Sequence, residues 1–157
     1  MKNIYSFVML SLLLVFTSCD NTLKDEELPL IDMTGETAFP KNCVTVYRGE
    51  SFTFKAHFTD NIELGSYSIE MHHNFDHHTH STSAEECEMG ALKVAVTPLL
   101  FIEEYTIEAG KTEYPASIEI SIPSDVDTGD YHFMVRLTDK SGWQTFEGIS
   151  MKIADRN

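Results

Sequence analysis

The sequence predicts an all-β fold. From Leu28 onward, short segments alternate apolar and polar residues or are rich in β-branched and aromatic residues. Turn residues separate these segments at short intervals, and no stretch keeps a helical period long enough to compete. Frequent short strands of this kind are typical of an immunoglobulin-like β-sandwich rather than of an open sheet. We therefore expect about seven strands in two sheets.

The expected strands follow one another along the chain with a turn between each pair. The first covers 44–47, the second 51–59, and the apolar run Leu92 to Phe101 predicts the fourth, with Pro98 at an edge or a bulge. Five of the expected strands carry a stripe of residues that should face the core. These stripes are Phe52, Phe54, Ala56 and Phe58, then Tyr67, Ile69 and Met71, then Ile118, Ile120 and Ile122, then Tyr131, Phe133, Val135 and Leu137, and finally Phe146, Ile149, Met151 and Ile153. These stripes predict one continuous core.

The N-terminus carries an export signal. Lys2 is the only charged residue before the apolar stretch Phe7 to Phe16, which is too short to span a bilayer and suits the h-region of a signal peptide. Phe16-Thr17-Ser18-Cys19 then resembles a bacterial lipobox, of the relaxed kind that Bacteroidota lipoproteins use. The resemblance implies a signal peptide at 1–18, a lipidated Cys19 and an acidic tether at 19–27, followed by the β-sandwich domain at 28–157.

The charge balance excludes one class of partner. Asp plus Glu outnumber Lys plus Arg by 25 to 11, for a formal net charge of −14. This sign is wrong for neutralising a phosphate backbone, so we expect no nucleic-acid partner. Within the tether, Lys24-Asp25-Glu26-Glu27 resembles the tag that exports some Bacteroidota lipoproteins to the cell surface. A charge run of this kind is also typical of a solvated linker.

Two cysteines remain once Cys19 is assigned to lipid. An exported chain folds in an oxidising compartment, so Cys43 and Cys87 most simply form one disulfide. The alternative is that Cys87, which follows the histidine cluster, is a thiolate ligand of a metal. That alternative leaves Cys43 as a free thiol.

A dense histidine cluster is the strongest functional signal. Five of the seven histidines fall within nine positions of the stretch MHHNFDHHTHS at 71–81. Neutral imidazole is the commonest protein ligand of zinc and copper, and a carboxylate can add to it. The candidate ligands in this stretch are His72, His73, Asp76, His77, His78 and His80. His78 and His80 project to the same side of an extended segment, which would let them chelate one ion.

A seventh candidate ligand comes from the neighbouring strand. If Tyr67 and Met71 face inward, alternation places His72 on the outer face, and the same argument places His132 there. The third and sixth expected strands are neighbours in an immunoglobulin-like sheet, so these two histidines are cross-strand partners about 5 Å apart at Cβ if the register is right. His57 belongs to the opposite sheet and does not join them.

Four aspartates, Asp60, Asp125, Asp130 and Asp139, could suggest a calcium site. Their spacing lacks the dense alternation of a dedicated oxygen cage. Roles in Asx turns and loop caps explain them more simply.

No catalytic signature is present. The sequence contains no HExxH helix, GxSxG elbow, P-loop or dinucleotide fingerprint. His78-Thr79-His80 begins like the HxHxDH motif of metal-dependent hydrolases, but Thr82 and Ser83 stand where that motif needs Asp and His. We therefore expect a protein that is not an enzyme, with zinc or copper as its bound ion.

The chain as a whole resembles the immunoglobulin-like modules of Bacteroidota envelope lipoproteins. The resemblance rests on the stretches 58–64, 122–131 and 137–142, and HHNFDHHTH resembles the central motif of a lipoprotein family with a domain of unknown function. It implies attachment to the outer membrane by the N-terminal lipid, on its periplasmic or its outer face. Two functions remain open, namely a metal-binding lipoprotein and a non-catalytic interaction module, for example an accessory subunit of a surface nutrient-uptake complex with an envelope protein as partner.

Overall fold

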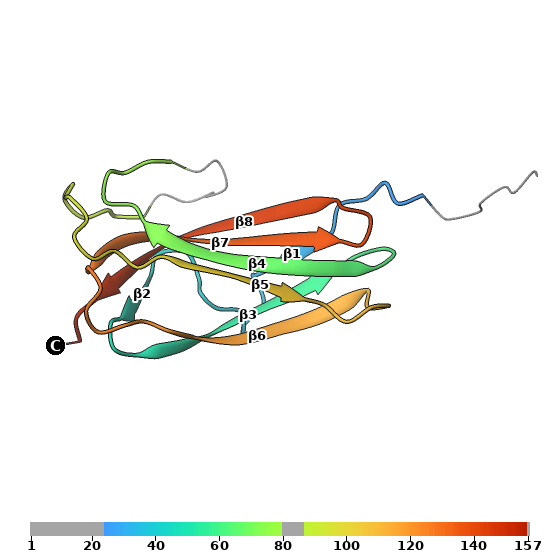
Figure 1. The fold of residues 1–157 in the computed structure, drawn as a ribbon, viewed down its shortest axis with the longest axis horizontal. Helices are drawn as coiled ribbons and strands as arrows, with labels where there is room; N and C mark the ends of the chain where they lie inside the picture. The colour runs from blue at the N-terminus through green and yellow to red at the C-terminus, as the bar shows by residue number, and fades with distance from the viewer. Residues whose placement is uncertain (1–23, 80–86, 157) are drawn as a thin grey trace, which may run out of the picture.

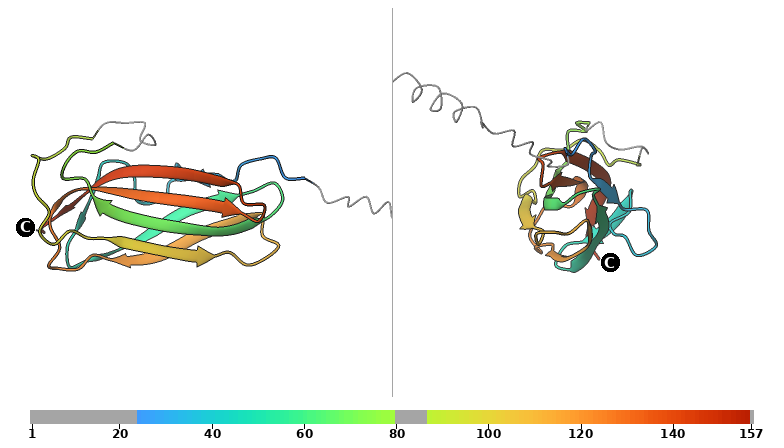
Figure 2. Two further views of the ribbon diagram at one scale, coloured as in Figure 1. Left: turned by 45° about the horizontal axis from the view of Figure 1, so that its top comes forward. Right: turned by 90° about the vertical axis from the view of Figure 1, so that its right-hand side faces the viewer.

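The computed structural model describes residues 24–79 and 87–156, in which eight strands form two sheets packed face to face (Figure 1). The strands are β1 (Leu30–Asp32), β2 (Val44–Tyr47), β3 (Ser51–Thr59), β4 (Leu64–His73), β5 (Phe101–Thr106), β6 (Glu113–Ser121), β7 (Gly129–Asp139) and β8 (Gln144–Ala154). The two layers are seen end-on in Figure 2. Within the described residues, no helix is long and apolar enough to cross a membrane.

The strand order is that of an immunoglobulin-like sandwich. One sheet has the order β1-β3-β6 and the other β2-β8-β7-β4-β5. With β1, β3 and β6 as strands A, B and E, and with β4, β7 and β8 as strands C, F and G, both sheets match the immunoglobulin arrangement. β5 extends the second sheet beyond strand C, and β2 pairs parallel to β8 at its other edge. The predicted fold class is therefore confirmed.

The core lies between the two sheets and consists of the inward stripes. Phe133 on β7 packs on Phe54 of β3 with ring centroids 5.6 Å apart, and Tyr67 on β4 packs on Phe58 at 5.0 Å. All four rings are almost completely buried. Aromatic pairs across the two layers add to the burial of apolar area, which is the main term that holds the sheets together.

Tyr131 forms a tyrosine corner near the start of β7. Its hydroxyl donates to the backbone oxygen of Asp127 at 2.7 Å and accepts from the backbone N–H of Leu99 at 3.2 Å. A tyrosine that bonds back to the backbone a few residues upstream at this place is a hallmark of immunoglobulin-like domains. The corner also holds the long loop before β5 against the end of the sandwich.

We expect Tyr131→Phe to destabilise the domain by about 1–3 kcal/mol, because it leaves the buried Leu99 N–H without its acceptor. Chemical denaturation followed by fluorescence measures the change. The matched control is Tyr47→Phe, which removes a hydroxyl that makes no hydrogen bond within the described residues. Equal unfolding midpoints for the two variants would contradict this role of the corner.

The structure corrects the expected strand at Leu92 to Phe101. Residues 92–100 form a loop, and the strand in this region is β5, which begins at Phe101. Val94 is 88% exposed, so the apolar run does not belong to the core. The backbone N–H groups of Val96 and Thr97 donate to the carboxylate of Asp127 instead of to a neighbouring strand. The hydrogen bonds of these two N–H groups to Asp127 take the place of the hydrogen bonds that a neighbouring strand would accept.

Two further expectations differ from the structure. Phe146 is half exposed on β8, whereas Ile149, Met151 and Ile153 are buried. Three positions separate Phe146 from Ile149, so alternation places them on opposite faces of the strand. β1 has only three residues and no stripe of its own, which is why the sequence pattern did not predict it.

Candidate metal centre

Two of the predicted ligands face each other across neighbouring strands. β4 and β7 pair antiparallel, and His72 lies directly opposite His132 in the register. Alternation places both side chains on the outer face of the five-stranded sheet, and both residues lie where β4 ends and β7 begins. The register that the sequence analysis required is thus the register of the sheet.

The segment after β4 folds back over this outer face. The backbone N–H of Asn74 donates to the Asp130 carbonyl at 2.8 Å, and that of His77 donates to the Asn74 carbonyl at 3.3 Å. His77 sits at a φ of 57°, a left-handed conformation that reverses the chain. The reversal brings His78 over the sheet, and His132 is only 6% exposed in consequence. His132 thus lies on the outer face as expected, but the segment covers it and keeps it from solvent.

Three imidazole rings meet beneath this segment. The rings of His72 and His78 are stacked with centroids 5.4 Å apart, and that of His132 lies 5.5 Å from the first and 5.1 Å from the second. The Nε2 atoms of His72 and His78 are 3.3 Å apart. We call His72, His78 and His132 the histidine cluster.

Carboxylates contact the far sides of two of these rings. Asp76 Oδ1 lies 2.6 Å from Nδ1 of His78, and Glu70 Oε1 lies 2.9 Å from Nδ1 of His72. The first contact is a hydrogen bond in which the ring N–H donates, whereas the second is an electrostatic contact without hydrogen-bond alignment. The bond from His78 holds the pKa of the Asp76 carboxyl below its usual value, so this carboxylate stays ionised in mild acid.

The contact between the Nε2 atoms of His72 and His78 depends on where each ring carries its proton. Since Asp76 can only accept, Nδ1 of His78 carries a proton, and Nε2 of the neutral ring presents a lone pair toward His72. If neutral His72 carries its proton on Nε2, its Nδ1 lone pair faces Glu70. If it carries the proton on Nδ1, two lone pairs face each other at 3.3 Å. Either a second proton on His72 or a metal ion between the two Nε2 atoms removes the conflict.

His132 positions the segment that carries His78. Its Nε2 donates to the backbone oxygen of His78 at 3.1 Å. The predicted ligand role would therefore have to use Nδ1 of His132 in this geometry. Ligand imidazoles usually donate their second ring N–H to a carboxylate or a backbone carbonyl, and Nε2 of His132 makes a bond of this kind.

The other predicted ligands lie elsewhere. Asp76 contacts His78 as described, and so stands behind the ring rather than beside its Nε2. His73 projects to the other side of β4 and packs on Phe75 with ring centroids 4.8 Å apart. His77 is used in the chain reversal, and its Nε2 is buried without a hydrogen-bond partner among the described residues. His80 and the lipidation site Cys19 fall outside the described residues.

Sequence reasoning missed Glu70. It lies two positions before His72, and alternation therefore places both on the outer face of β4. This spacing could have predicted the contact, because a carboxylate two residues before a histidine on the same strand face can reach Nδ1 of its ring.

Cys43 and Cys87 are joined by a disulfide, with a Cα to Cα distance of 5.4 Å. The alternative that Cys87 is a thiolate ligand does not hold in this structure, since its sulfur is bonded to Cys43. The disulfide ties the chain that follows the histidine-rich stretch to the start of β2.

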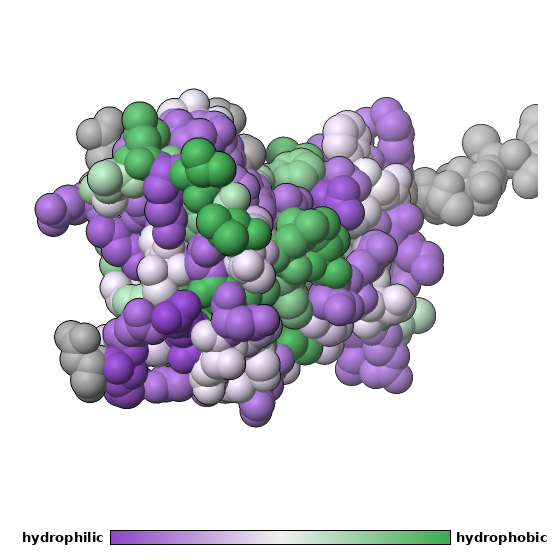
Figure 3. All heavy atoms as spheres, turned by 60° about the vertical axis from the view of Figure 1, so that its left-hand side comes forward, coloured by the Kyte–Doolittle hydropathy of each residue, from purple (hydrophilic) through white to green (hydrophobic). Residues whose placement is uncertain are grey.

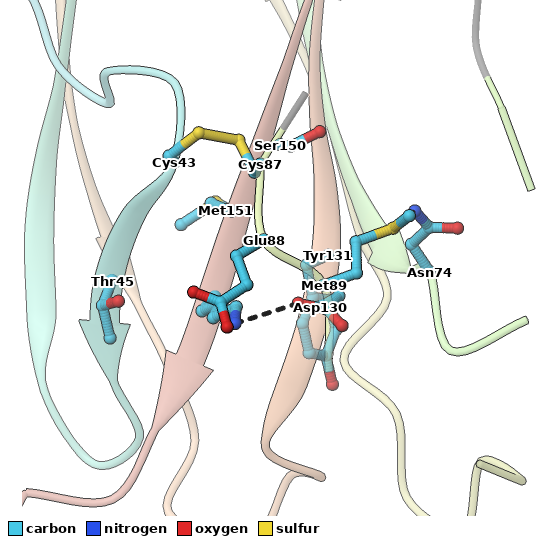
Figure 4. A pocket seen from close by; sticks show the side chains of 11 residues that line it. Cys43, Thr45, Asn74, Cys87, Glu88, Met89, Asp130, Tyr131, Ser150 and Met151 are labelled. Carbon is cyan, nitrogen blue, oxygen red and sulfur yellow. Dashed lines mark hydrogen bonds and ion pairs between the residues drawn. A yellow bond between two sulfur atoms is a disulfide. The ribbon is translucent and has the colours of Figure 1, made fainter. Parts of the chain in front are cut away.

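A cavity of about 230 Å³ lies beside the disulfide (Figure 4). It is lined by Cys43, Thr45, Asn74, Cys87, Glu88, Met89, Asp130, Tyr131, Ser150, Met151 and Lys152. Lys152 forms an ion pair with Asp130 at 3.8 Å across it, and the amide of Asn74 contacts the Met89 sulfur. Among the described residues, neither the candidate histidines nor Asp76 line this cavity, so it is separate from the histidine cluster.

Comparisons with known proteins give a family and several distant likenesses to solved structures. The family model described as "Domain of unknown function (DUF4625)" matches residues 17–154. The search of curated proteins found no match. Among solved structures, the chain is similar to a "GspB Siglec domain", with a TM-score of 0.46 and 24% identity over 84% of this chain and 60% of that one.

A second solved structure is Spo0M, a sporulation control protein from Bacillus subtilis, with a TM-score of 0.43 and 11% identity. That match covers 83% of this chain and 51% of Spo0M. The chain thus spans little more than half the length of either solved protein. Both TM-scores are too low to support a fold assignment, which rests on the strand order and the register.

Proposed function

The chain belongs to the family with the domain of unknown function DUF4625, and we propose that within this family fold it binds a transition metal, zinc or copper, through the histidine cluster. The observation that carries the proposal is the 3.3 Å separation of the Nε2 atoms of His72 and His78. Zinc binds imidazole nitrogen at about 2.0–2.1 Å with tetrahedral angles, which places two ligand nitrogens about 3.3 Å apart.

The surroundings of the pair support the same proposal. Ligand imidazoles usually donate their second N–H to a carboxylate, and Asp76 stands in this relation to His78. Glu70 adds a negative charge behind His72. Nitrogen donors of this type suit zinc and copper rather than the hard cations magnesium and calcium. We expect a buffering or capture role for the site and no catalysis.

Calorimetric titration of the tag-free full chain with zinc and with copper tests the proposal. We expect saturable binding of one ion. The same titration with His80→Ala tests whether the predicted ligand outside the described residues contributes. If neither metal binds saturably, the metal-binding proposal is wrong, and the interaction module described below takes its place.

The affinity for zinc should depend on pH in one direction. Imidazole must lose its proton to bind a metal, so affinity should fall as the pH drops through about 6, by roughly tenfold per pH unit for each imidazole that is protonated. Because the pKa of Asp76 is lowered, its carboxylate remains charged across this range and does not contribute to the loss. Zinc affinity that stayed constant from about pH 7.5 to 5 would contradict imidazole ligation.

We further propose that the protein is an envelope lipoprotein anchored to the outer membrane by Cys19. Residues 24–29 enter the sandwich at the end opposite the histidine cluster (Figure 1). An anchor before them would leave the cluster pointing away from the membrane. Mass spectrometry of protein purified from membranes should find an acylated peptide that begins at Cys19. Recovery of an unmodified Cys19 in a soluble form would contradict the anchor.

An interaction module is the second candidate function, and one surface favours it. The loop 88–100 and the start of β5 expose the apolar side chains of Leu92, Val94, Val96, Leu100 and Ile102. Hydrophobic residues gather on the face of the molecule that Figure 3 brings forward. Contiguous exposed apolar side chains are typical of protein interaction sites. An envelope protein partner would occupy this surface without involving the histidine cluster.

A further inference from the structure

Three carboxylates converge at the end of the sandwich opposite the histidine cluster. Asp25 comes from the N-terminal segment, Asp60 from the loop after β3, and Asp139 is the last residue of β7. One carboxylate oxygen from each lies within 4.8 Å of the other two. The sequence analysis placed Asp25 in a solvated tether, but the residue is only 8% exposed, so the tether packs against the sandwich from this position onward.

One oxygen of each carboxylate is held by the backbone. Asp60 Oδ2 accepts from the N–H groups of Ile62 and Glu63 at 2.8 and 2.7 Å. Asp139 Oδ1 accepts from the N–H of Trp143 at 2.8 Å. Asp25 Oδ1 accepts from the N–H of Glu27 at 3.2 Å. The turn and cap roles expected for Asp60 and Asp139 are therefore present, but they use only half of each carboxylate.

The second oxygen of each carboxylate is buried and accepts no hydrogen bond from any described residue. These atoms are Oδ2 of Asp25, Oδ1 of Asp60 and Oδ2 of Asp139. Asp139 is only 3% exposed. A buried carboxylate oxygen without a donor is costly, and the great majority of such atoms in folded proteins have a partner.

The described part of the chain places no cationic partner on these three carboxylates. Within the described residues, no lysine, arginine or histidine forms an ion pair with any of the three aspartates. Negative groups this close repel each other strongly when partly removed from water. The backbone N–H groups that bind one oxygen of each carboxylate nevertheless hold the three side chains in place.

We propose that Asp25, Asp60 and Asp139 bind a calcium ion that fastens the N-terminal segment to the sandwich. Oxygen donors alone select a hard cation over zinc or copper. Calcium binds oxygen at 2.3–2.6 Å, so two of its ligands lie at most about 5 Å apart, in agreement with the observed spread. Three converging carboxylates suit calcium better than magnesium, because magnesium keeps several of its water ligands and binds through only one or two carboxylates.

The calcium site would hold the N-terminal segment at 25–29 in one position against the sandwich. Besides its carboxylate, Asp25 offers its backbone oxygen to the indole N–H of Trp143 at 3.2 Å. Thr145 on β8 donates to the backbone oxygen of Pro29. With calcium bound, residues 25–29 form one rigid unit with the ends of β3 and β7. Without calcium, repulsion among the carboxylates favours release of Asp25.

Terbium luminescence tests the proposal on the full chain in detergent. Terbium replaces calcium in oxygen sites and emits when a nearby indole transfers energy to it, and Trp143 is the only tryptophan of the chain. We expect sensitised emission that calcium displaces. We also expect millimolar calcium to raise the Tm by about 5 °C over that in EDTA. Magnesium at equal concentration should give a clearly smaller rise.

Matched variants decide whether the three aspartates are responsible. Asp139→Asn and Asp25→Asn should each weaken calcium binding at least tenfold, whereas Asp125→Asn, an exposed aspartate at the other end, should not. Asp25→Asn alters a residue outside the strands, so its loss of emission can be read even if Asp139→Asn fails to fold. Absence of sensitised emission, equal responses of Asp25→Asn and Asp125→Asn, or a magnesium effect equal to that of calcium would each overturn the proposal.

The calcium test is independent of the proposed metal site. The double variant His72→Ala with His78→Ala should keep its terbium emission and its response to calcium.

Discussion

Zinc affinity should fall at least about a hundredfold when His72 and His78 are both replaced by alanine, because the two Nε2 atoms 3.3 Å apart supply the paired nitrogen donors of the site. Loss of one imidazole alone leaves a single donor and should also weaken binding. Calorimetry of the wild-type chain and of each variant measures the change. A double variant that binds zinc as tightly as the wild type would place the metal elsewhere.

Two further variants separate ligation from general effects of histidine removal. His57→Ala removes a histidine from the exposed face of β3, in the other sheet, and should leave zinc affinity unchanged. Asp76→Asn keeps the size of the side chain but weakens its hold on Nδ1 of His78. Partners behind a metal ligand contribute about 10–100-fold in affinity, so this variant should lie between the wild type and the double variant.

Removal of the disulfide should lower the free energy of unfolding by about 4 kcal/mol. The bond closes a loop of 44 residues, which restricts the unfolded chain and therefore stabilises the folded one. Urea denaturation of the double variant Cys43→Ala with Cys87→Ala measures the loss against the oxidised wild type. Because the bridge also fixes the chain beyond the histidine-rich stretch, zinc affinity should fall modestly in the same variant.

Urea denaturation in the presence of a thiol reductant is the matched control for this prediction. The reductant should destabilise the wild type and leave the double cysteine variant unchanged. Peptide mapping of the unreduced protein should recover the peptides of Cys43 and Cys87 as one linked species. Separate peptides, or an unfolding midpoint that reductant does not shift, would contradict the contribution of the bond.

The parts of the fold that the sequence predicted are those governed by alternation. Tyr67, Ile69 and Met71 face the core as expected, and the same alternation placed both His72 and His132 on the outer face. Alternation is a local property of the strand, so a single sequence is sufficient to obtain it. The fold class also predicted that the two strands are neighbours. Their register, which decides whether His72 pairs with His132, came only from the structure.

The failures arise where a nonlocal contact overrides the local pattern. The apolar run at 92–100 looks like a strand, but Asp127, some thirty positions away, captures its backbone N–H groups. Asp25 looks like part of a charged linker, and only the fold brings it to Asp60 and Asp139. The three aspartates are far apart in the sequence, so no local pattern could predict that they meet.

The histidine cluster was predicted in part for the same reason. The high number of histidines identified the stretch at 71–81 as a candidate site, but it did not predict which imidazole rings would contact each other. The chain reversal at His77 determines which rings meet, because it stacks His78 on His72 and leaves His77 out of the cluster. Glu70 gained its role only through the contact with His72.

The most direct test of a cation between His72 and His78 is nitrogen NMR of the imidazole rings in uniformly labelled protein, with and without zinc. Zinc is diamagnetic, so the shifts report protonation and metal ligation at each nitrogen. The proposed site predicts that Nε2 of both rings moves to a metal-bound shift while Nδ1 of His78 stays protonated against Asp76. Zinc-induced shifts at other histidines only, with these two rings unchanged, would contradict it.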